Sequence, residues 1–488
     1  MNKVRLAMVC VVAASLVAAT FARANLGPTT EATRVVLELN NPVVRVISGD
    51  ERNVTLPVAP TVFSGRTFVP LRGVLELFGA EVTWRDPDRV LIRATDSEVV
   101  LRIGRTTATV NGETRTLAAA PRIVAGRTLI PLRFVSEALG LRVTWHADTN
   151  TIDIARWNYR AVAQIVTVQV DNIARRLNVV EVPPDSNLRP TLGLGRGVVG
   201  NVEPLSSMAG QHGAVLGING GYFQAYSLPH EPYTTLMHHG RLVHRGGFGS
   251  AVAFMRDGRV MMERVRVEVH GTTHGRDEWG FRWHCYFVNR TPERDSSAVV
   301  VFTPERGATI GLDFGVAIVV SNGRVVDVRE RTDVAIPQDG YVIHLANEHN
   351  SLRGQFAMGT PVDFALSFTD DEHMRLDWRD AETIVGAGPL LVQAGINVAN
   401  PAAEGFTEAK ILSMSLNRSA IGLRADGTIL LVTTPALTIR QLADAFIALG
   451  AVEAMALDGG GSSGLYFEDR YITRPGRQLS NALLFVPR

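Results

Sequence analysis

The sequence predicts a mixed α+β protein in which a small domain of two ββαββ repeats precedes a larger, sheet-rich α/β domain. Three observations lead to this fold class. The chain has 488 residues, too many for one ordinary hydrophobic core. A segment of about sixty residues occurs twice in its first third. Glycine is abundant, at 45 residues, while aromatic residues make up only 7%, which favours sheets over helical bundles.

Composition and charge narrow the function classes. Hydrophobic residues make up 46% and charged residues 20%, which is typical of a globular protein. The formal net charge is +1 and there are no long basic or acidic blocks, so nucleic acid is not expected as a partner. Beyond the first 24 residues the only cysteine is Cys285, so no disulfide within one chain is expected.

Residues 1–24 have the pattern of a secretory signal peptide. Lys3 and Arg5 give a basic start, 6–21 are apolar, and the small-x-small site at 22–24 precedes the expected cleavage. A retained membrane anchor is the alternative, but the apolar run is short for a full span. We therefore expect a secreted or envelope-associated protein with no membrane segment after cleavage.

A repeated unit is expected to fill residues 33–156. The segment 59–72 returns as 120–133, and the match continues without a gap as far as Trp84 and Trp145. Each copy is expected to run strand, strand, helix, strand, strand. A proline, Pro70 or Pro131, opens each helix, and a glycine, Gly79 or Gly140, ends it. For Arg72, Trp84 and their copies, core and salt-bridge roles are favoured over a ligand-binding face.

The second domain is expected over 160–488. Strands are expected at 165–171 and 177–182, and many short strands with turn signals at 250–345. The G-x-G-x-x-G pattern at 195–200 is not interpreted as a dinucleotide site, because Pro190 and the turn residues before it argue against the strand that such a site needs.

A buried strand at 214–218 ends in Asn219, Gly220 and Gly221. This ending is either a hairpin turn or a place where the backbone meets a ligand. The loop that follows contains His230 and Glu231, which are possible proton-transfer groups or simply solvated surface. Histidines such as His270 and His274 lack a convincing ligand spacing, so no metal site is expected.

The C-terminal third contains the clearest signals. Gly386 and Gly388 interrupt a strand, where the backbone could approach a ligand. A capping box at 438–441 opens a helix that should end at Gly450. The next apolar strand leads to Asp458, followed by Gly459, Gly460, Gly461 and Ser462. We interpret Asp458 and this glycine loop as the floor of an active site.

The G-R-T-x-V/I-P-L-R core of the repeat, followed by V-T-W, resembles the copper amine oxidase N-terminal, or stalk, domain. The family name does not imply copper chemistry here. The Asn158-Tyr-Arg160 segment does not match the oxidase cofactor motif, and no His-x-His pair occurs, so no cofactor is expected. The resemblance implies a spacer or a module that binds a cell-wall or envelope polymer.

The second domain resembles the phosphodiester glycosidase family over about 160–488. The motifs that carry the resemblance are Ile218-Asn-Gly-Gly-Tyr-Phe223, Gly386-Ala-Gly-Pro389, Arg418-Ser-Ala-Ile-Gly422 and Leu457-Asp-Gly-Gly-Gly-Ser-Ser463. Family members usually have proline and threonine where this chain has Asn417 and Ser419. Arg418 is retained.

The resemblance implies a secreted hydrolase that cleaves the glycosidic bond of sugar-1-phosphodiesters, with a glycan or sugar phosphate as substrate. Arg418 would bind the phosphate, Asn219 would fix the sugar or the phosphate, and Asp458 would be the catalytic carboxylate, as base, nucleophile or orienting group. The substrate-binding residues would be Gly220, Gly221, Gly386, Gly388, Gly459, Gly460, Gly461 and Ser462. Glu231 is a candidate for a second carboxylate.

Two other functions compete with this one. The first is a glycan-binding envelope protein with a degenerate, non-catalytic pocket, motivated by Asn417 and Ser419. The second is a structural wall protein, which would account for the repeats but leaves the glycine loop unexplained.

Overall fold

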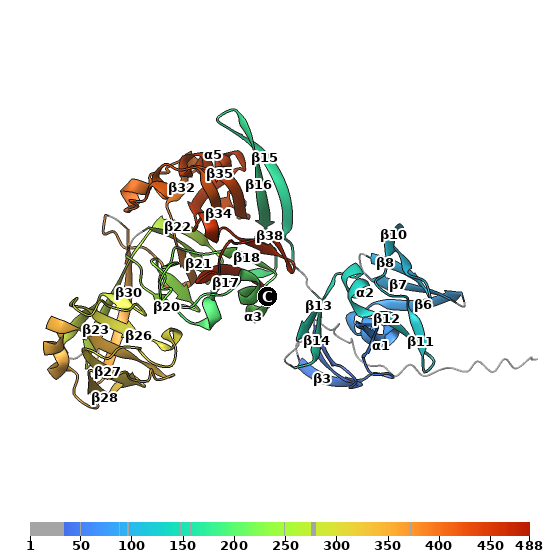
Figure 1. Cartoon of the computed structure of the whole chain (residues 1–488), viewed down its shortest axis with the longest axis horizontal. Coiled ribbons are helices and arrows are strands. Elements are labelled where there is room, and N and C mark those ends of the chain that lie inside the picture. Colours follow the sequence, from blue (N-terminus) through green and yellow to red (C-terminus); the bar gives the residue numbers. More distant parts are fainter. Residues whose placement is uncertain are drawn as a thin grey trace, which may run out of the picture. The chain divides into compact units, whose positions relative to one another are not determined.

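The computed structural model describes residues 34–488 apart from 49, 87, 95–96, 147–148, 157–158, 248, 275–279 and 371. It divides into two compact units, one up to residue 157 and one from residue 158 onward (Figure 1). The signal peptide predicted at 1–24 lies outside the described residues. In the part of the chain that is described, no helix is long and apolar enough to cross a membrane.

The first unit contains two equivalent runs of hairpin, helix and hairpin, the element order predicted from the sequence. The first run consists of β4 (Thr61–Phe63), β5 (Arg66–Pro70), α1 (Leu71–Leu75), β6 (Glu81–Asp86) and β7 (Arg89–Ala94). The second consists of β11 (Arg122–Val124), β12 (Arg127–Pro131), α2 (Leu132–Ala138), β13 (Leu141–His146) and β14 (Thr151–Arg156). Each helix begins directly after a proline. In the first run, Gly79 stops the helical segment with a φ of 75°.

The two runs meet through the antiparallel pair β5 and β12. Val69 pairs with Ile130, its equivalent in the other run, as expected for a local twofold axis. Three further strands extend the last hairpin of each run into a five-stranded sheet. They are β1 (Arg34–Glu38), β2 (Val43–Ser48) and β3 (Asp50–Thr55) beside β14, and β8 (Ser97–Arg102), β9 (Thr107–Val110) and β10 (Glu113–Thr116) beside β7.

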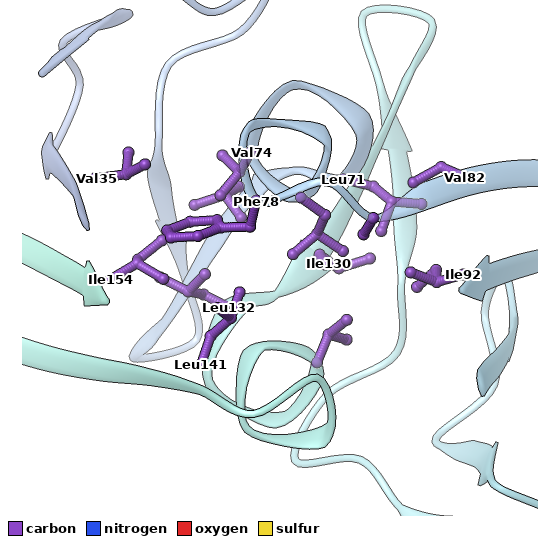
Figure 2. Close-up of a cluster of buried hydrophobic side chains, with 14 of the residues drawn as sticks. Val35, Leu71, Val74, Phe78, Val82, Ile92, Ile130, Leu132, Leu141 and Ile154 are labelled. Atoms are coloured by element: carbon purple, nitrogen blue, oxygen red, sulfur yellow. The ribbon is translucent and has the colours of Figure 1, made fainter. Parts of the chain in front are cut away.

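Apolar side chains from both runs fill one core between these sheets. Figure 2 shows Phe78 next to Ile154 and Leu132, and Ile130 among residues of both runs. Trp84 and Trp145 are not part of this core. They are 40% and 42% exposed, so the core role expected for them is wrong. Arg72 does form the expected kind of contact, an ion pair of 3.2 Å with Glu76.

The described residues of the second unit form five sheets. The seven-stranded sheet has the order β15 (Val162–Val170), β16 (Ile173–Val182), β35 (Ile429–Leu437), β34 (Leu416–Arg424), β36 (Ala451–Ala456), β32 (Leu390–Gln393), β33 (Ile396–Asn397). The next has the order β17 (Leu188–Leu194), β39 (Asn481–Pro487), β18 (Leu216–Asn219), β37 (Leu465–Phe467), β38 (Arg470–Thr473). These two sheets supply the strands that end at the candidate site.

The other three sheets lie between these strands in the sequence. One has the order β20 (Arg241–His244), β19 (Leu236–His238), β31 (Ala381–Gly386), β21 (Ser250–Met255), β22 (Val260–Arg264). A three-stranded sheet has the order β24 (Arg282–Cys285), β23 (Arg266–Thr273), β30 (Val362–Thr369). The last has the order β25 (Phe287–Val288), β26 (Val299–Phe302), β29 (Gly340–Leu345), β27 (Val316–Ser321), β28 (Arg324–Glu330).

The predicted α+β fold class, with an α/β second domain, is wrong. Strands make up 50% of the structure and helices 13%. The α-helices described in the second unit are α3 (Leu205–His212), α4 (Ala409–Leu412) and α5 (Ile439–Ala448). Every ladder between described strands is antiparallel except the two-residue pairing of β25 with β26. Antiparallel strands need only short turns, whereas the parallel sheet of an α/β domain needs a crossover, usually a helix, between successive strands.

Two local predictions have different outcomes. The capping box at α5 is confirmed: the Gln441 N–H donates to Thr438 Oγ1 at 3.2 Å, and the Thr438 N–H donates to Gln441 Oε1 at 3.1 Å. The expectation that no strand precedes Gly195 is wrong, because β17 ends at Leu194. A short 3₁₀ turn follows Gly195 instead of an α-helix, so the helix N-terminus of a dinucleotide site is absent there.

Candidate active site

The register of the seven-stranded sheet brings Arg418 and Asp458 to the same edge. β34 and β36 are antiparallel, and Ala420 pairs with Ala456. The Leu457 N–H donates to the Ser419 carbonyl at 2.8 Å and so continues the ladder. One step further, Arg418 and Asp458 lie opposite each other. Two neighbouring strands thus bring Arg418 and Asp458 to the same edge of the sheet, where both line one cavity.

A cavity of about 340 Å³ opens at this edge. Six of the predicted site residues line it: Asp458, Arg418, Gly459, Gly460, Gly461 and Ser462. The remaining five do not: Asn219, Gly220, Gly221, Gly386 and Gly388. The structure therefore brings the glycine loop and the arginine together around one space, with the other predicted residues behind its wall.

Asp458 lies at the end of β36, partly exposed to the cavity. Burial raises the pKa of Asp458 to about 6, because the charged carboxylate loses most of its water. The Ser462 hydroxyl and the Gly459 N–H act in the opposite direction, as do the nearby charges of Arg477 and Lys410. A carboxylate with this pKa is mostly ionised at neutral pH and gains a proton in mild acid.

The glycines after Asp458 are explained largely by a neighbouring segment of the chain. Gly460 has a φ of 59°, which favours glycine. A Cβ on Gly461 would lie 3.0 Å from Nη2 of Arg477, and one on Gly464 would lie 2.3 Å from Cγ of Pro475. The Gly476 N–H also donates to the Gly461 carbonyl at 2.8 Å. Residues 475–477 therefore pack directly against the glycine loop.

Asn219 holds the glycine loop from behind. Its side-chain Nδ2 donates to the Asp458 carbonyl at 2.6 Å, and its Oδ1 accepts from the Gly464 N–H at 3.0 Å. The Asp458 N–H donates to the Gly220 carbonyl at 3.0 Å. The Asn219 side chain is buried and both of its polar atoms are occupied. It holds the main chain at Asp458 and does not line the cavity.

The other predicted glycines permit close packing around this support. A Cβ on Gly220 would lie 2.0 Å from Oδ1 of Asn481, and one on Gly221 would lie 2.0 Å from the Gly386 carbonyl oxygen. A Cβ on Gly386 would lie 2.7 Å from the Thr235 nitrogen, and one on Gly388 would lie 2.9 Å from Oε2 of Glu404. These residues set the position of the strands and stand one layer away from the cavity.

Arg418 is a buried wall residue, only 4% exposed. Its Nε donates to the Leu437 carbonyl at 2.8 Å, and its Nη2 donates to the carbonyls of Lys410 and Met414 at 2.9 and 2.6 Å. Burial lowers the pKa of the Arg418 guanidinium, and the nearby Tyr222 opposes that shift. Most of its donors therefore tie β34 to β35 and to the α4 segment.

The cavity also contains residues that the sequence did not single out. They are aromatic or charged: Tyr222, Tyr226, Tyr233, Phe406, Glu408, Lys410 and Arg477. Tyr222 follows the Asn-Gly-Gly segment directly, so its place in the motif is a signal that could have identified it. The hydroxyl of Tyr222 donates to the Gly388 carbonyl at 2.9 Å. Lys410 lies in the short helix α4 and Arg477 lies in an irregular segment, and no sequence pattern marks either residue.

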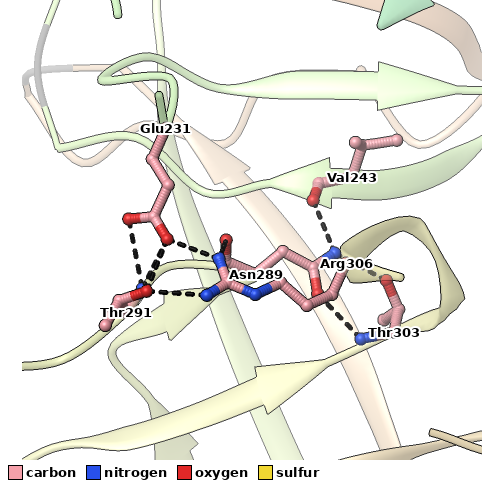
Figure 3. Close-up of polar contacts among 6 residues, drawn as sticks. All are labelled: Glu231, Val243, Asn289, Thr291, Thr303 and Arg306. Carbon is pink, nitrogen blue, oxygen red and sulfur yellow. Dashed lines mark hydrogen bonds and ion pairs between the residues drawn. The ribbon is translucent and has the colours of Figure 1, made fainter. Parts of the chain in front are cut away.

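Glu231, the candidate second carboxylate, lies outside the cavity and is fully engaged elsewhere. It forms an ion pair with Arg306, and the hydroxyl of Thr291 donates to it at 2.6 Å (Figure 3). Arg306 Nη1 also donates to the Asn289 carbonyl at 3.4 Å, and the Asn289 side chain donates to the Val243 carbonyl at 2.8 Å. His230 likewise is not a lining residue, and its Nδ1 lies 2.8 Å from the Gln224 carbonyl.

Comparison with protein families finds two matches in the chain. Residues 48–154 match the copper amine oxidase N-terminal domain. Residues 314–486 match the phosphodiester glycosidase family. The second match contains Arg418, Asp458 and the glycine loop, and it begins after Asn219. Each match covers less than half of the chain. Among the described residues, no group of three His, Cys, Asp or Glu side chains could hold a metal ion.

Solved structures share the fold of this chain. A hypothetical protein from Synechocystis aligns over 94% of this chain and 93% of its own, with 20% identity and a TM-score of 0.59. A protein from Burkholderia pseudomallei K96243 aligns over 64% and 74%, with 22% identity and a TM-score of 0.54. Both likenesses concern the fold alone.

A third likeness is weaker. The catalytic domain of zebrafish N-acetylglucosamine-1-phosphodiester α-N-acetylglucosaminidase, auto-inhibited by its pro-peptide, aligns over 73% of this chain and 94% of its own, with 13% identity. Its TM-score of 0.37 is too low for residue-by-residue comparison. No curated protein matches the sequence.

Proposed function

We propose that the second unit hydrolyses the glycosidic bond of sugar-1-phosphodiesters. The observation that carries this proposal is a partly buried carboxylate, Asp458, facing a cavity of about 340 Å³ that also contains Arg418, Lys410 and Arg477. Cavities that hold small ligands range over about 300–1,000 Å³, so this one is suited to a single sugar ring with its phosphate. The match of residues 314–486 to the phosphodiester glycosidase family supports the same reaction.

The chemistry needs few groups. Water adds to the anomeric carbon, the bond from that carbon to the phosphate oxygen breaks, and the phosphate leaves as a monoester that needs little protonation. A carboxylate is needed to stabilise the developing positive charge, to attack the anomeric carbon or to accept the proton from water. Asp458 is ionised for any of these roles above its pKa of about 6. Cations beside it balance the charge of the departing phosphate.

In this proposal the predicted residues divide into two groups. Asp458 acts on the substrate, while Gly459, Gly460, Gly461 and Ser462 line the space beside it. Asn219, Gly220, Gly221, Gly386 and Gly388 act through packing and hydrogen bonds that fix the position of that loop. The three-residue catalytic set of Asp458, Arg418 and Asn219 thus becomes one reacting group and two positioning residues.

Location and partners form part of the same proposal. The apolar segment within residues 1–24 supports secretion. The first unit would be a stalk that binds a cell-wall or envelope polymer, and the substrate would be envelope or exopolysaccharide material. Trp84 and Trp145, exposed at equivalent positions of the two runs, are suited to contacts with such a polymer.

A non-catalytic glycan-binding protein is the second candidate. Asn417 and Ser419 beside Arg418, together with the donors of Arg418 that are bound to main-chain carbonyls, favour it. Incubating the protein with a UDP-linked or chromogenic sugar-1-phosphodiester separates the two. Release of free sugar that is lost in Asp458→Ala is expected for the glycosidase. Binding without release, by both proteins, would leave only the binding function.

A further inference from the structure

The sequence suggested that Arg418 binds the phosphate of the substrate. In the structure, Arg418 is poorly placed for a bidentate contact with a phosphate. A bidentate grip uses two adjacent N–H groups of one guanidinium. The Nε and Nη2 atoms of Arg418 are already bound to the carbonyls of Leu437, Lys410 and Met414. Only Nη1 has no hydrogen-bond partner among the described residues. Arg418 could therefore offer a phosphate one nitrogen, unless it released the segments that it joins.

Arg477 has the opposite character. It lines the same cavity and is partly exposed, with its guanidinium lying against Gly461. Nη2 donates to the Tyr226 hydroxyl at 3.2 Å, and Cζ lies 5.1 Å from the centre of the Tyr226 ring. In the described part of the chain, the Nε and Nη1 groups of Arg477 have no hydrogen-bond partner. One contact fixes the side chain while most of its donors remain available.

Lys410 adds a second cation at the opening of the cavity. It is exposed, and its Nζ forms an ion pair of 2.5 Å with Glu408, which also lines the cavity. The lining therefore contains three cationic side chains, Arg418, Lys410 and Arg477, and two carboxylates, Asp458 and Glu408. The excess of one positive charge at neutral pH matches the single negative charge of a phosphodiester.

We infer that Arg477 and Lys410, at the mouth of the cavity, bind the phosphate of the substrate, and that Tyr226 holds the Arg477 guanidinium in place. Arg418 then acts as a positioning residue in the wall. The sugar would occupy the interior beside Asp458, and the group beyond the phosphate would lie over the exposed Tyr226, whose relative exposure is 82%. This inference rests on the proposed function for the identity of the substrate.

The test compares two substrates that differ in the phosphate. One is a sugar-1-phosphodiester and the other is the 4-nitrophenyl glycoside of the same sugar, which has no phosphate. Arg477→Ala is expected to raise KM about ten- to a hundredfold for the phosphodiester, the range of a charge-assisted hydrogen bond, and to leave KM for the aryl glycoside unchanged. The inhibition constant of inorganic phosphate, as a competitive inhibitor, should rise in Arg477→Ala by the same factor as KM for the phosphodiester.

Two variants make the comparison sharper. Arg474→Ala is the matched control, because Arg474 lies on the same segment but packs on Tyr471, 4.4 Å from the ring centre, and does not line the cavity. It should behave as the unmodified protein. Tyr226→Phe removes the acceptor for Arg477 and keeps the ring. It should raise KM for the phosphodiester by a smaller factor than Arg477→Ala, without changing kcat.

The outcomes separate this inference from the proposed function. An equal effect of Arg477→Ala on both substrates, or equal behaviour of Arg477→Ala and Arg474→Ala, would overturn the role of Arg477 while the glycosidase stands. If the unmodified protein cleaves neither substrate, the proposed function fails, and calorimetric titration with the intact phosphodiester decides the inference. Binding lost in Arg477→Ala but kept in Arg474→Ala supports it, and binding that is the same in both refutes it.

Discussion

The side-chain amide of Asn219 donates a hydrogen bond of 2.6 Å to the main-chain carbonyl of Asp458. The same side chain accepts from the Gly464 N–H at 3.0 Å, so one buried residue clamps the glycine loop at both ends. The loop carries little side-chain mass of its own to fix its shape. The clamp is therefore what holds the Asp458 carboxylate at the cavity.

Asn219→Asp is expected to abolish most activity and to lower the free energy of unfolding by about 1–3 kcal/mol. The new carboxylate has no donor for the Asp458 carbonyl and would face it at close range. Urea unfolding and kcat measure the two effects. Asn289→Asp is the matched control: Asn289 is equally buried, bridges Val243 and Thr303, and does not line the cavity. It should lose stability and keep kcat, and a similar loss of kcat in both variants would contradict the clamp.

The activity is expected to depend on the ionisation of Asp458. Because its pKa is raised to about 6, kcat/KM for a phosphodiester should be constant above pH 7 and fall tenfold per pH unit well below 6. A profile of kcat/KM against pH, measured over the pH range in which the protein stays folded, checks this prediction. A profile that stays flat down to pH 4.5 would mean that Asp458 does not act as a carboxylate.

Asp458→Asn should make the protein inactive and more stable at neutral pH. The folded protein holds the Asp458 proton more tightly than the unfolded chain, whose aspartate has a pKa near 3.8. Stability from this group is therefore fully present below that value and is lost as the pH rises to about 6. The variant should melt a few degrees above the original protein at pH 7 and at nearly the same temperature at pH 3.5. A lower melting temperature at pH 7 would contradict this.

Glu231→Gln is expected to destabilise the protein without changing the pH dependence of catalysis. The Arg306 side chain is only 11% exposed and would remain charged without its partner, which costs about 3–5 kcal/mol. Chemical unfolding measures the loss of stability, and a profile of kcat against pH tests whether the pH dependence of catalysis is unchanged. A shifted or missing limb in the pH profile would instead assign Glu231 a part in proton transfer.

Ile130→Ala is expected to lower the stability of the first unit by about 2–5 kcal/mol, because Ile130 is fully buried beside the axis between the two runs. Ile123→Ala is the control, since Ile123 lies on the adjacent strand and is 56% exposed. Differential scanning calorimetry should show the transition of one unit moving in Ile130→Ala only. If Ile123→Ala lowers it equally, the core assignment is wrong.

The parts of the structure that sequence could predict depend on contacts within a few residues. The capping box of Thr438 and Gln441 is an example, because both partners lie in one helical turn. Asp458 at the end of an apolar strand was visible for the same reason. Asn219 was predicted as a ligand for the substrate, but its hydrogen-bonding partners are 239 and 245 residues away in the chain. Nothing local distinguishes the two roles.

The rest of the site could not be found because a single helical turn and an irregular segment supply it. Lys410 lies in the four-residue helix α4 and Arg477 in an irregular segment, and only the folded chain brings them to the glycine loop. The loop itself was interpreted as bare backbone for a ligand, whereas Pro475 and Arg477 occupy the room that Gly464 and Gly461 leave. A run of glycines indicates a close approach, and sequence does not specify what approaches.

The pairing of β1 with β14 has a mechanical consequence. Arg34 pairs with Ala155, so the start of β1 and the end of β14 lie at the same end of one antiparallel ladder. Tension applied between residues 34 and 156 would act across the hydrogen bonds at that end. The pairs would then open one after another, from Arg34 toward Glu38, in an unzipping geometry that resists less force than shearing all of them at once. Under load, the first unit would therefore begin to open at the end of the ladder where Arg34 pairs with Ala155.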